Sequence, residues 1–325
     1  MRTESAPVTP LPALIPIGEI RAARPRVAQY AVRTPLVRFA ADRDIYLKLE
    51  NLQPIGSFKI RGASNALLQA DPSAVGEGVW TASAGNMAQG VAWCARVLGV
   101  PCRVVVPDHA PAAKTDAVER LGASIVRVPF LEWWDIIVTH TWRDAHGFFV
   151  HPVSNPAVIA GNGTIGLEVA EDLPDVDTVL VPYGGGGLSS GIASALREVA
   201  PNAKVYAVEV DTAAPLTPSL AAGRPVETTY TASFVDGIGS RSVLDEMWPL
   251  VRNVLAGARV VSLEQITEAV RLLVERTHVV AEGAGAAALA AALNANDDLG
   301  KVVCIVSGGN IDRAKLVRIL DGAIP

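Results

Sequence analysis

The sequence predicts an α/β fold with two open, mainly parallel sheets that carry helices on both faces. Three observations support this class. Short runs rich in β-branched residues recur along the 325 residues, amphipathic segments of helix length separate many of them, and 50% of the residues are hydrophobic. Alternation of this kind is typical of parallel sheets, in which ligands bind at the carboxyl ends of the strands.

The elements follow one another in a regular order. Residues 1–30 are rich in proline and predict a lead-in arm with one helix. The β-branched runs predict strands at 45–50, 79–83, 102–107, 124–128, 178–182, 204–210, 258–262 and 301–307. Apolar periodicity predicts helices at 86–98, 111–121, 187–199, 263–276 and 284–294, with a helical connection near 155–171. The two runs 79–150 and 178–325 therefore predict two sheets.

The bulk composition limits the partners. Net charge is -5 and no dense run of Lys and Arg occurs, so neither nucleic acid nor an anionic membrane is an expected partner. The first 20 residues are broken by proline, and no uncharged apolar segment of membrane-spanning length follows. The cysteines Cys94, Cys102 and Cys304 are odd in number and scattered, which favours reduced thiols. Together these features predict a cytoplasmic protein with a small-molecule ligand.

The stretch GSFKIRGASN, residues 56–65, places Lys59 between Phe58 and Ile60. If the stretch is helical, the lysine lies on an apolar stripe with Ile55, Ala63, Ala66 and Ala70. A desolvated ammonium is unfavourable, so such a lysine has a paired carboxylate, a path to water, or a shifted pKa and a chemical role.

A run of glycines follows the strand predicted at 178–182. The sequence YGGGGLSSG, residues 183–191, precedes a helix, so converging backbone N–H groups and the helix N-terminus form a cup for an anion, most naturally phosphate. A Walker loop is excluded because Gly-Lys-Ser/Thr is absent, and the dinucleotide fingerprint fails at Ser190. That fingerprint does fit Gly283, Gly285 and Ala288, but in an alanine-rich stretch that we interpret as close helix packing.

A competing motif overlaps the glycine run. Residues 187–191 satisfy G-x-S-x-G, the nucleophile elbow of α/β hydrolases, with Ser189 as the nucleophile. A triad is completed by His278 and by Asp236 or Asp245. A serine hydrolase is therefore a distant alternative. It lacks an HGGG-type oxyanion segment and gives the buried lysine no role.

Two further turns lie where strands end. TASAGNMAQG, residues 81–90, offers the hydroxyl of Ser83, the backbone of Gly85 and the amide of Asn86 to a carboxylate, or simply caps the next helix. SGGN, residues 307–310, presents the Ser307 hydroxyl, again with a helix cap as the alternative. Metal-ligand spacing is absent from the cysteines and from the histidines at 109, 140, 146, 151 and 278, so no metal is predicted.

A lysine on an apolar face, a phosphate cup, a carboxylate-binding turn and a hydroxyl at a strand end fit together if the ligand is pyridoxal 5'-phosphate. The sequence also resembles a known family. Five motifs match, in order and spacing, the serine/threonine dehydratase and serine racemase family of fold type II pyridoxal-phosphate enzymes (tryptophan synthase beta-like): GSFKIRGASN, TASAGNMAQGVA, HPVSNPAVIAGNGTIGLEV, VPYGGGGLSSGIA and SGGNID.

The resemblance implies a role for each motif residue. Lys59 matches the Schiff-base lysine, Phe58 the neighbour of the cofactor ring, Asn86 the amide bonded to the pyridoxal hydroxyl, and Ser307 the partner of the pyridine nitrogen. The phosphate loop matches Gly184, Gly185, Gly186, Gly187 and Leu188, and the substrate-carboxylate loop matches Ser83, Ala84, Gly85, Asn86 and Met87. It also implies a large cofactor domain, 1–76 with 152–325, and a small mobile domain, 77–151, that closes over the substrate.

The implied activity is that of a dehydratase, or ammonia-lyase, which converts L-threonine, L-serine or a related β-hydroxy amino acid to a 2-oxo acid and ammonia. The alternative on the same scaffold is a serine-type racemase. Racemases carry a serine where this chain has Ala84, so dehydration is favoured. Relatives are commonly homodimers.

Other positions depart from the family pattern. Met87 replaces a usual histidine, and Pro215 replaces one acidic ligand of the family's divalent-cation site although Glu209 is present. Trp133 and Trp134 are also unusual, and predict extra packing or an altered wall of the cleft.

Overall fold

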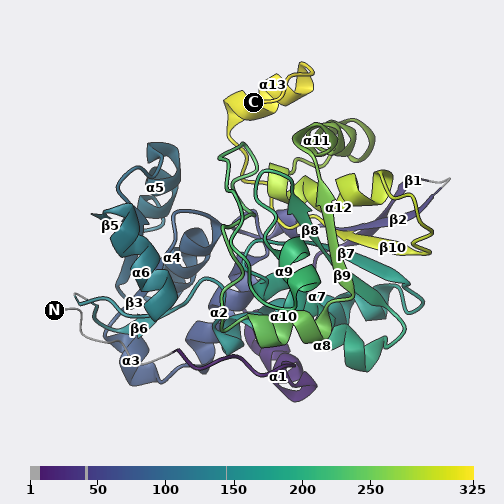
Figure 1. Cartoon of the computed structure of the whole chain (residues 1–325). Coiled ribbons are helices and arrows are strands. Elements are labelled where there is room, and N and C mark those ends of the chain that lie inside the picture. The colour runs from purple at the N-terminus through teal and green to yellow at the C-terminus, as the bar shows by residue number, and fades with distance from the viewer. Residues whose placement is uncertain (1–7, 41–42, 144) are drawn as a thin grey trace.

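The computed structural model describes residues 8–40, 43–143 and 145–325, and these form two sheets surrounded by helices (Figure 1). The larger sheet has the order β1-β2-β10-β7-β8-β9. All its pairs are parallel except β1 with β2. Its strands are β1 (Leu36–Ala40), β2 (Arg43–Lys48), β7 (Thr178–Pro182), β8 (Lys204–Val210), β9 (Gly257–Val261) and β10 (Val302–Ile305).

The smaller sheet has the order β5-β4-β3-β6 and is parallel throughout. Its strands are β3 (Val79–Ala82), β4 (Cys102–Pro107), β5 (Ser124–Val128) and β6 (Phe148–Phe149). Figure 1 places this sheet and helices α3 to α6 on one side of the molecule and the larger sheet on the other. We propose the domain division 1–76 with 152–325 and 77–151 on the ground that each sheet takes its strands from one part.

The helices cover both sheets. They are α1 (Ile17–Val27), α2 (Lys59–Gln69), α3 (Pro72–Gly76), α4 (Asn86–Leu98), α5 (Ala112–Glu119), α6 (Phe130–Thr139), α7 (Pro156–Asp172), α8 (Gly187–Val199), α9 (Leu216–Ala222), α10 (Trp248–Val254), α11 (Leu263–Thr277), α12 (Gly283–Leu293) and α13 (Arg313–Leu320). In the described part of the chain, no helix combines the length and apolar character required to cross a membrane.

Both faces of the larger sheet are buried, as its β-branched strands require. Leu180, Val208 and Cys304 pack in one cluster with the alanines of α12. Their neighbours along the same strands, Val179 and Val303, pack in a second cluster with residues of α7 and α8. Successive side chains of a strand point to opposite faces, so the two helical layers share one sheet.

The predicted fold class is confirmed, and the strands predicted at 102–107, 124–128, 178–182 and 204–210 coincide with β4, β5, β7 and β8. Some details were wrong. The predictions did not include β1, the two-residue β6, the tryptophan-containing α6 or the helices α3, α9, α10 and α13, and they extended the apolar stripe of Lys59 back to Ile55. Helix α2 instead begins at Lys59, after a turn with Gly56 at a φ of 71°.

Each sheet has a point at which the chain order reverses. In the larger sheet β7 leads to β8 on one side while β10 lies on the other, and in the smaller sheet β3 leads to β4 while β6 lies on the other side. Ligands of open α/β sheets bind in the crevice at such points, beyond the carboxyl ends of the strands. The loops that leave β3, β6, β7 and β10 are therefore the ones expected to form a site.

Candidate functional site

Those four loops line one cavity of about 710 Å³ between the two sheets. This volume is typical of small-molecule sites. The cavity brings together all of the residues that the sequence analysis selected: Phe58, Lys59, Ser83, Ala84, Gly85, Asn86, Met87, Gly184, Gly185, Gly186, Gly187, Leu188 and Ser307. Their roles remain predictions, but their convergence from four separate segments is a finding of the structure.

Lys59 is the first residue of α2, and its amine faces the cavity. Nζ donates a hydrogen bond to the backbone oxygen of Pro152 at 3.2 Å and lies 5.1 Å from the centroid of the Phe58 ring. The Lys59 side chain is half-buried. Loss of hydration lowers the Lys59 pKa to about 8, although the negative charge of Glu282 acts to raise it. An amine with this pKa gains and loses a proton near neutral pH.

The glycine run forms the turn between β7 and α8. Gly186 has a φ of 92° and is the N-cap of α8, and no side chain caps this helix. The N–H groups of the first helical turn therefore lack an intrahelical acceptor and can bind an anion. A Cβ atom on Gly185 would lie 2.5 Å from Cγ1 of Val153, so the glycine is needed because the 151–155 segment crosses directly over the loop.

The loop after β3 leads into α4, whose N-cap is Gly85 and which also has no side-chain cap. The predicted alternative, that Ser83 or Asn86 caps this helix, is wrong: Ser83 Oγ accepts a hydrogen bond from Gly85 N at 3.3 Å, and Asn86 is the first helical residue. Ser307, 4% exposed, is likewise no helix cap, and its backbone oxygen accepts a hydrogen bond from Phe58 N at 3.0 Å. This contact ties the loop after β10 to the start of α2.

Glu282 lines the same cavity and was missed by the sequence analysis. Burial raises its pKa to about 7, although a hydrogen bond from Asn86 opposes the shift. The available signal was an isolated carboxylate directly before an otherwise apolar, alanine-rich helix. The role of this carboxylate could not be predicted from the sequence, because its hydrogen-bond partner, Asn86, is 196 positions away.

Helix α6 supplies one wall of the cavity through Phe130, Leu131, Trp133 and Trp134. The prediction of an altered cleft wall is therefore the better of the two alternatives for the tryptophans. Met87 is 1% exposed, lines the cavity and packs into the hydrophobic core, so it contributes shape rather than charge.

The hydrolase alternative is wrong. Ser189 is 1% exposed within α8, and its hydroxyl donates to the backbone oxygen of Gly186 at 3.2 Å. His278 is exposed at the far end of α11. The last glycine of the motif has a packing role, because a Cβ on Gly191 would lie 2.4 Å from the backbone oxygen of Ile159 in α7.

Glu209 is buried at the end of β8, and burial raises its pKa. Its carboxylate accepts hydrogen bonds from Leu216 N at 2.6 Å, Thr217 N at 2.8 Å and Thr217 Oγ1 at 2.7 Å. These donors stand at the N-terminus of α9, which the carboxylate therefore caps. Glu209 has a structural role in this chain.

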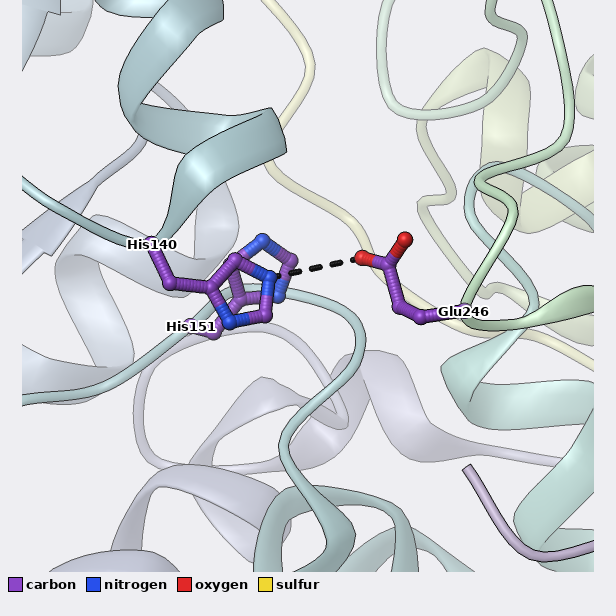
Figure 2. A group of neighbouring side chains, drawn as sticks. All are labelled: His140, His151 and Glu246. Carbon is purple, nitrogen blue, oxygen red and sulfur yellow. Dashed lines mark hydrogen bonds and ion pairs between the residues drawn. The ribbon is translucent and has the colours of Figure 1, made fainter. Parts of the chain in front are cut away.

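A second group of titratable side chains links the end of α6 to the segment just before α10. Figure 2 shows His140, at the end of α6, directed at the carboxylate of Glu246, with the ring of His151 beside it. Nε2 of His140 lies 3.3 Å from Oε1 of Glu246, and the two imidazole centroids are 4.2 Å apart. Among the described residues, these three form the one group of His, Cys, Asp and Glu close enough to hold a metal ion.

The chemistry of His151 argues against a metal. Its Nδ1 accepts the N–H of Ser154 at 2.8 Å, so Nε2 carries the proton and donates to the backbone oxygen of Ile137 at 3.1 Å. Burial, together with His140, lowers the His151 pKa to about 3. A neutral ring with both nitrogens engaged has no lone pair for a metal, and we assign the group to positioning of the 151–155 segment.

Comparison with known proteins places the site in context. A family model described as "Pyridoxal-phosphate dependent enzyme" matches residues 27–308. An L-threonine ammonia-lyase of Geobacter sulfurreducens is 44% identical over 272 residues, which cover 82% of this chain and 67% of that protein. A serine racemase of Oryza sativa subsp. indica is 35% identical over 316 residues, 91% of each chain. The structure of maize serine racemase superposes with a TM-score of 0.84 at 33% identity, covering 95% of this chain and 98% of that one.

Proposed function

Because the chain belongs to the family of pyridoxal-phosphate dependent enzymes and pyridoxal phosphate is its cofactor, we propose that it is an ammonia-lyase acting on L-threonine, L-serine or a related β-hydroxy amino acid. The observation that carries the proposal is that one cavity is lined both by an amine of lowered pKa and by an uncapped, glycine-rich helix start. The similarity to an L-threonine ammonia-lyase supports the substrate class.

The residues present fit the cofactor. The uncapped first turn of α8, with Gly184 to Gly187 before and within it, suits a phosphate, and a side chain on Gly185 would collide with Val153. Lys59 would hold the aldehyde carbon, while Asn86 and Ser307 would bind the ring's polar atoms. Pyridoxal phosphate supplies an aldehyde that condenses with amines and a ring that withdraws electrons from the α-carbon.

The chain's own residues provide binding and proton transfer. The N–H groups at the start of α4, with Ser83, bind the substrate carboxylate at the loop 83–87. Nζ of Lys59 takes the α-proton, since its pKa of about 8 suits a general base near neutral pH. The α-proton and the β-hydroxyl leave the substrate together as one water, and the released enamine takes up one water to give the 2-oxo acid and ammonia. The reaction is redox-neutral and consumes no net water.

Racemisation is the second candidate, favoured by the similarity to serine racemases. It requires a second acid or base on the other side of the α-carbon, and Ala84 has none. The two activities are separated by assaying 2-oxobutanoate from L-threonine, pyruvate from L-serine and D-serine from L-serine with the purified holoenzyme. We expect keto acid with little D-serine, and Ala84→Ser should raise the share of D-serine. If no β-hydroxy amino acid in a panel yields keto acid, the lyase proposal fails.

We further propose that the enzyme works in the cytoplasm as a homodimer. The three cysteines are free and buried, which suits a reducing compartment. Light scattering after size-exclusion chromatography should give twice the 34.0 kDa of one chain. A monomeric mass at micromolar concentration would contradict the dimer.

A further inference from the structure

Three polar side chains from separate elements meet at the edge of the cavity: Asn86 of α4, Glu282 before α12, and Asn310 after β10. Asn86 Nδ2 donates to Glu282 Oε1 at 2.7 Å, and Asn86 Oδ1 accepts from Asn310 Nδ2 at 2.8 Å. Both ends of the Asn86 amide are therefore held by side chains.

The orientation of the Asn86 amide follows from a backbone oxygen. Asn310 Nδ2 also donates to the backbone oxygen of Ile55 at 2.9 Å, and a carbonyl can only accept, so this end of Asn310 must be its NH₂ group. The same NH₂ group faces Asn86 and requires an acceptor there, which places Asn86 Oδ1 toward Asn310 and Nδ2 toward Glu282. Among the hydrogen bonds of the described residues, Nδ2 then has one acceptor, and its second N–H is unused.

Glu282 is fixed against the loop that carries Ser307. Its backbone N–H donates to Gly308 O at 3.0 Å, and a Cβ on Gly308 would lie 2.5 Å from Glu282 Oε1. A Cβ on Gly237 would lie 3.4 Å from the same oxygen. The carboxyl group thus has little freedom to move away from Asn86.

The charged groups that act on Glu282 come from three other elements. Lys59 of α2 and Lys114 of α5 favour its carboxylate form, whereas Asp236, in the segment between α9 and α10, disfavours it. Burial is the largest influence and keeps the pKa near 7. The Asn86 amide therefore donates to a group that is charged above neutral pH, where a charge-assisted hydrogen bond is stronger.

We propose that Glu282 is a positioning residue which, with Asn310, fixes the Asn86 amide so that its second N–H remains available to the cofactor. This inference rests on the proposed function, since it concerns how Asn86 meets pyridoxal phosphate. Its central consequence is that Glu282 acts through Asn86: removing the carboxyl should weaken cofactor binding only while the amide is present.

A double-mutant cycle tests that consequence. The affinity of the apoenzyme for pyridoxal phosphate is measured by absorption titration for wild type, Glu282→Ala, Asn86→Ala and the double variant. We expect the first substitution to weaken binding about tenfold, the second at least as much, and the double variant no more than Asn86→Ala alone, because residues in one hydrogen-bond network are not additive. Additive losses, or unchanged binding in Glu282→Ala, would overturn the proposal.

Two further variants separate positioning from general damage. Glu282→Gln keeps an acceptor for Asn86 Nδ2 and should stay within about threefold of wild type, as expected when a hydrogen-bond partner is retained. Glu209→Gln also removes a buried carboxylate, but one that caps α9, and should leave cofactor affinity unchanged. If Glu209→Gln weakened cofactor binding as much as Glu282→Ala, loss of any buried carboxylate would weaken it, and the positioning role of Glu282 would be contradicted.

The apoenzyme provides an independent readout. Infrared difference spectroscopy should reveal a carboxyl group that titrates near pH 7 and is lost in Glu282→Gln. Because the Asn86 hydrogen bond lowers the Glu282 pKa, Asn86→Ala should move this midpoint upward. An unmoved midpoint would contradict the contact. Wild-type protein that binds no pyridoxal phosphate would instead refute the proposed function, while this titration would still test the contact.

Discussion

Lys59 and Arg61 are two residues apart on α2, yet their charges have opposite surroundings. Arg61 is 1% exposed and contacts the carboxylates of Glu50 at 2.8 Å and Glu168 at 2.7 Å. Lys48, also fully buried, lies 2.7 Å from the second of these carboxylates. Lys59 has only a backbone oxygen as hydrogen-bond partner among the described residues.

The difference shows how one helix can carry a structural cation and a chemical one. Burial opposes the charge of both residues, but Glu50 and Glu168 raise the Arg61 pKa, whereas Lys59 has only the more remote Glu282 and its pKa falls to about 8. Arg61 therefore stays charged and anchors α2, while Lys59 can exchange its proton. Substitutions of each residue in turn test the distinction.

The largest expected effect is on stability, from Arg61→Met. It leaves the buried carboxylate of Glu50 without an ion-pair partner and Glu168 with Lys48 alone, and the free energy of unfolding should fall by about 3 to 5 kcal/mol. Lys59→Met breaks no ion pair and removes a charge that burial disfavours, so it should leave the free energy of unfolding unchanged or raise it. Urea denaturation of both apoproteins measures the contrast. Equal losses would show that the two cations share one role.

The effects on activity should have the reverse order, with the larger loss from substitution of Lys59. Lys59→Met should lower kcat/KM by at least about 10³-fold, since the base and the covalent attachment are both lost. Any Arg61→Lys protein that remains folded should keep most of its activity. Substantial turnover by Lys59→Met would contradict the assignment.

The glycine loop should be nearly as sensitive as the lysine. Gly185→Ala places a methyl group 2.5 Å from Cγ1 of Val153, so the loop or the 151–155 segment must move, and affinity for pyridoxal phosphate should fall about tenfold or more. Gly76→Ala has no neighbour within 4 Å and serves as the control. Unchanged cofactor affinity in Gly185→Ala would mean that the phosphate lies elsewhere.

The pH dependence of apoprotein stability should separate Lys59 from Arg61. The folded-state pKa of Lys59 lies below its ordinary value, so between about pH 8 and 10.5 the unfolded chain binds more protons at this group, and Lys59 contributes a stability that rises with pH. The Glu282 pKa is raised, so it contributes the opposite slope between about pH 4.5 and 7. Lys59→Met should remove the Lys59 contribution, measured as the difference in unfolding free energy between wild type and variant in urea across pH. A difference that stays constant from pH 8 to 10.5 would place the shifted group elsewhere.

The smallest effect is expected at the contact in Figure 2. His140→Asn removes the pair with Glu246, which links the tryptophan wall of α6 to the segment after α9, and should raise KM by up to about fivefold with kcat little changed. The matched control is His278→Asn, because both histidines end a helix with φ near 58°, at 59° and 57°, a conformation that asparagine tolerates. If both substitutions changed KM equally, the cause would be the altered helix end and not the loss of the contact with Glu246.

The sequence was sufficient for most strands of the two sheets and for most of the cavity. Runs such as TVLVP and KVYAVEV predict buried parallel strands because both of their faces are apolar, and the glycines that follow TVLVP mark the strand end where a ligand binds. Lys59 was identified because a charge inside an apolar pattern requires an explanation. These signals are local, so they can be read without knowledge of the fold.

The partners of these residues were not predictable in the same way. Asn86 meets Asn310 across 224 positions and His140 meets Glu246 across 106, and no spacing in the sequence indicates either contact. Strand β6 has only two residues, too few for a periodic pattern. The paired state of Arg61 and the unpaired state of Lys59 likewise depend on which carboxylates the fold brings to each side of α2.

Reduction with borohydride in the presence of pyridoxal phosphate, followed by peptide mass spectrometry, shows directly which amine binds the cofactor aldehyde. We expect one stoichiometric pyridoxyl adduct, on Lys59, that disappears in Lys59→Met. An adduct confined to another lysine, or no adduct on a protein saturated with the cofactor, would contradict the assignment of Lys59.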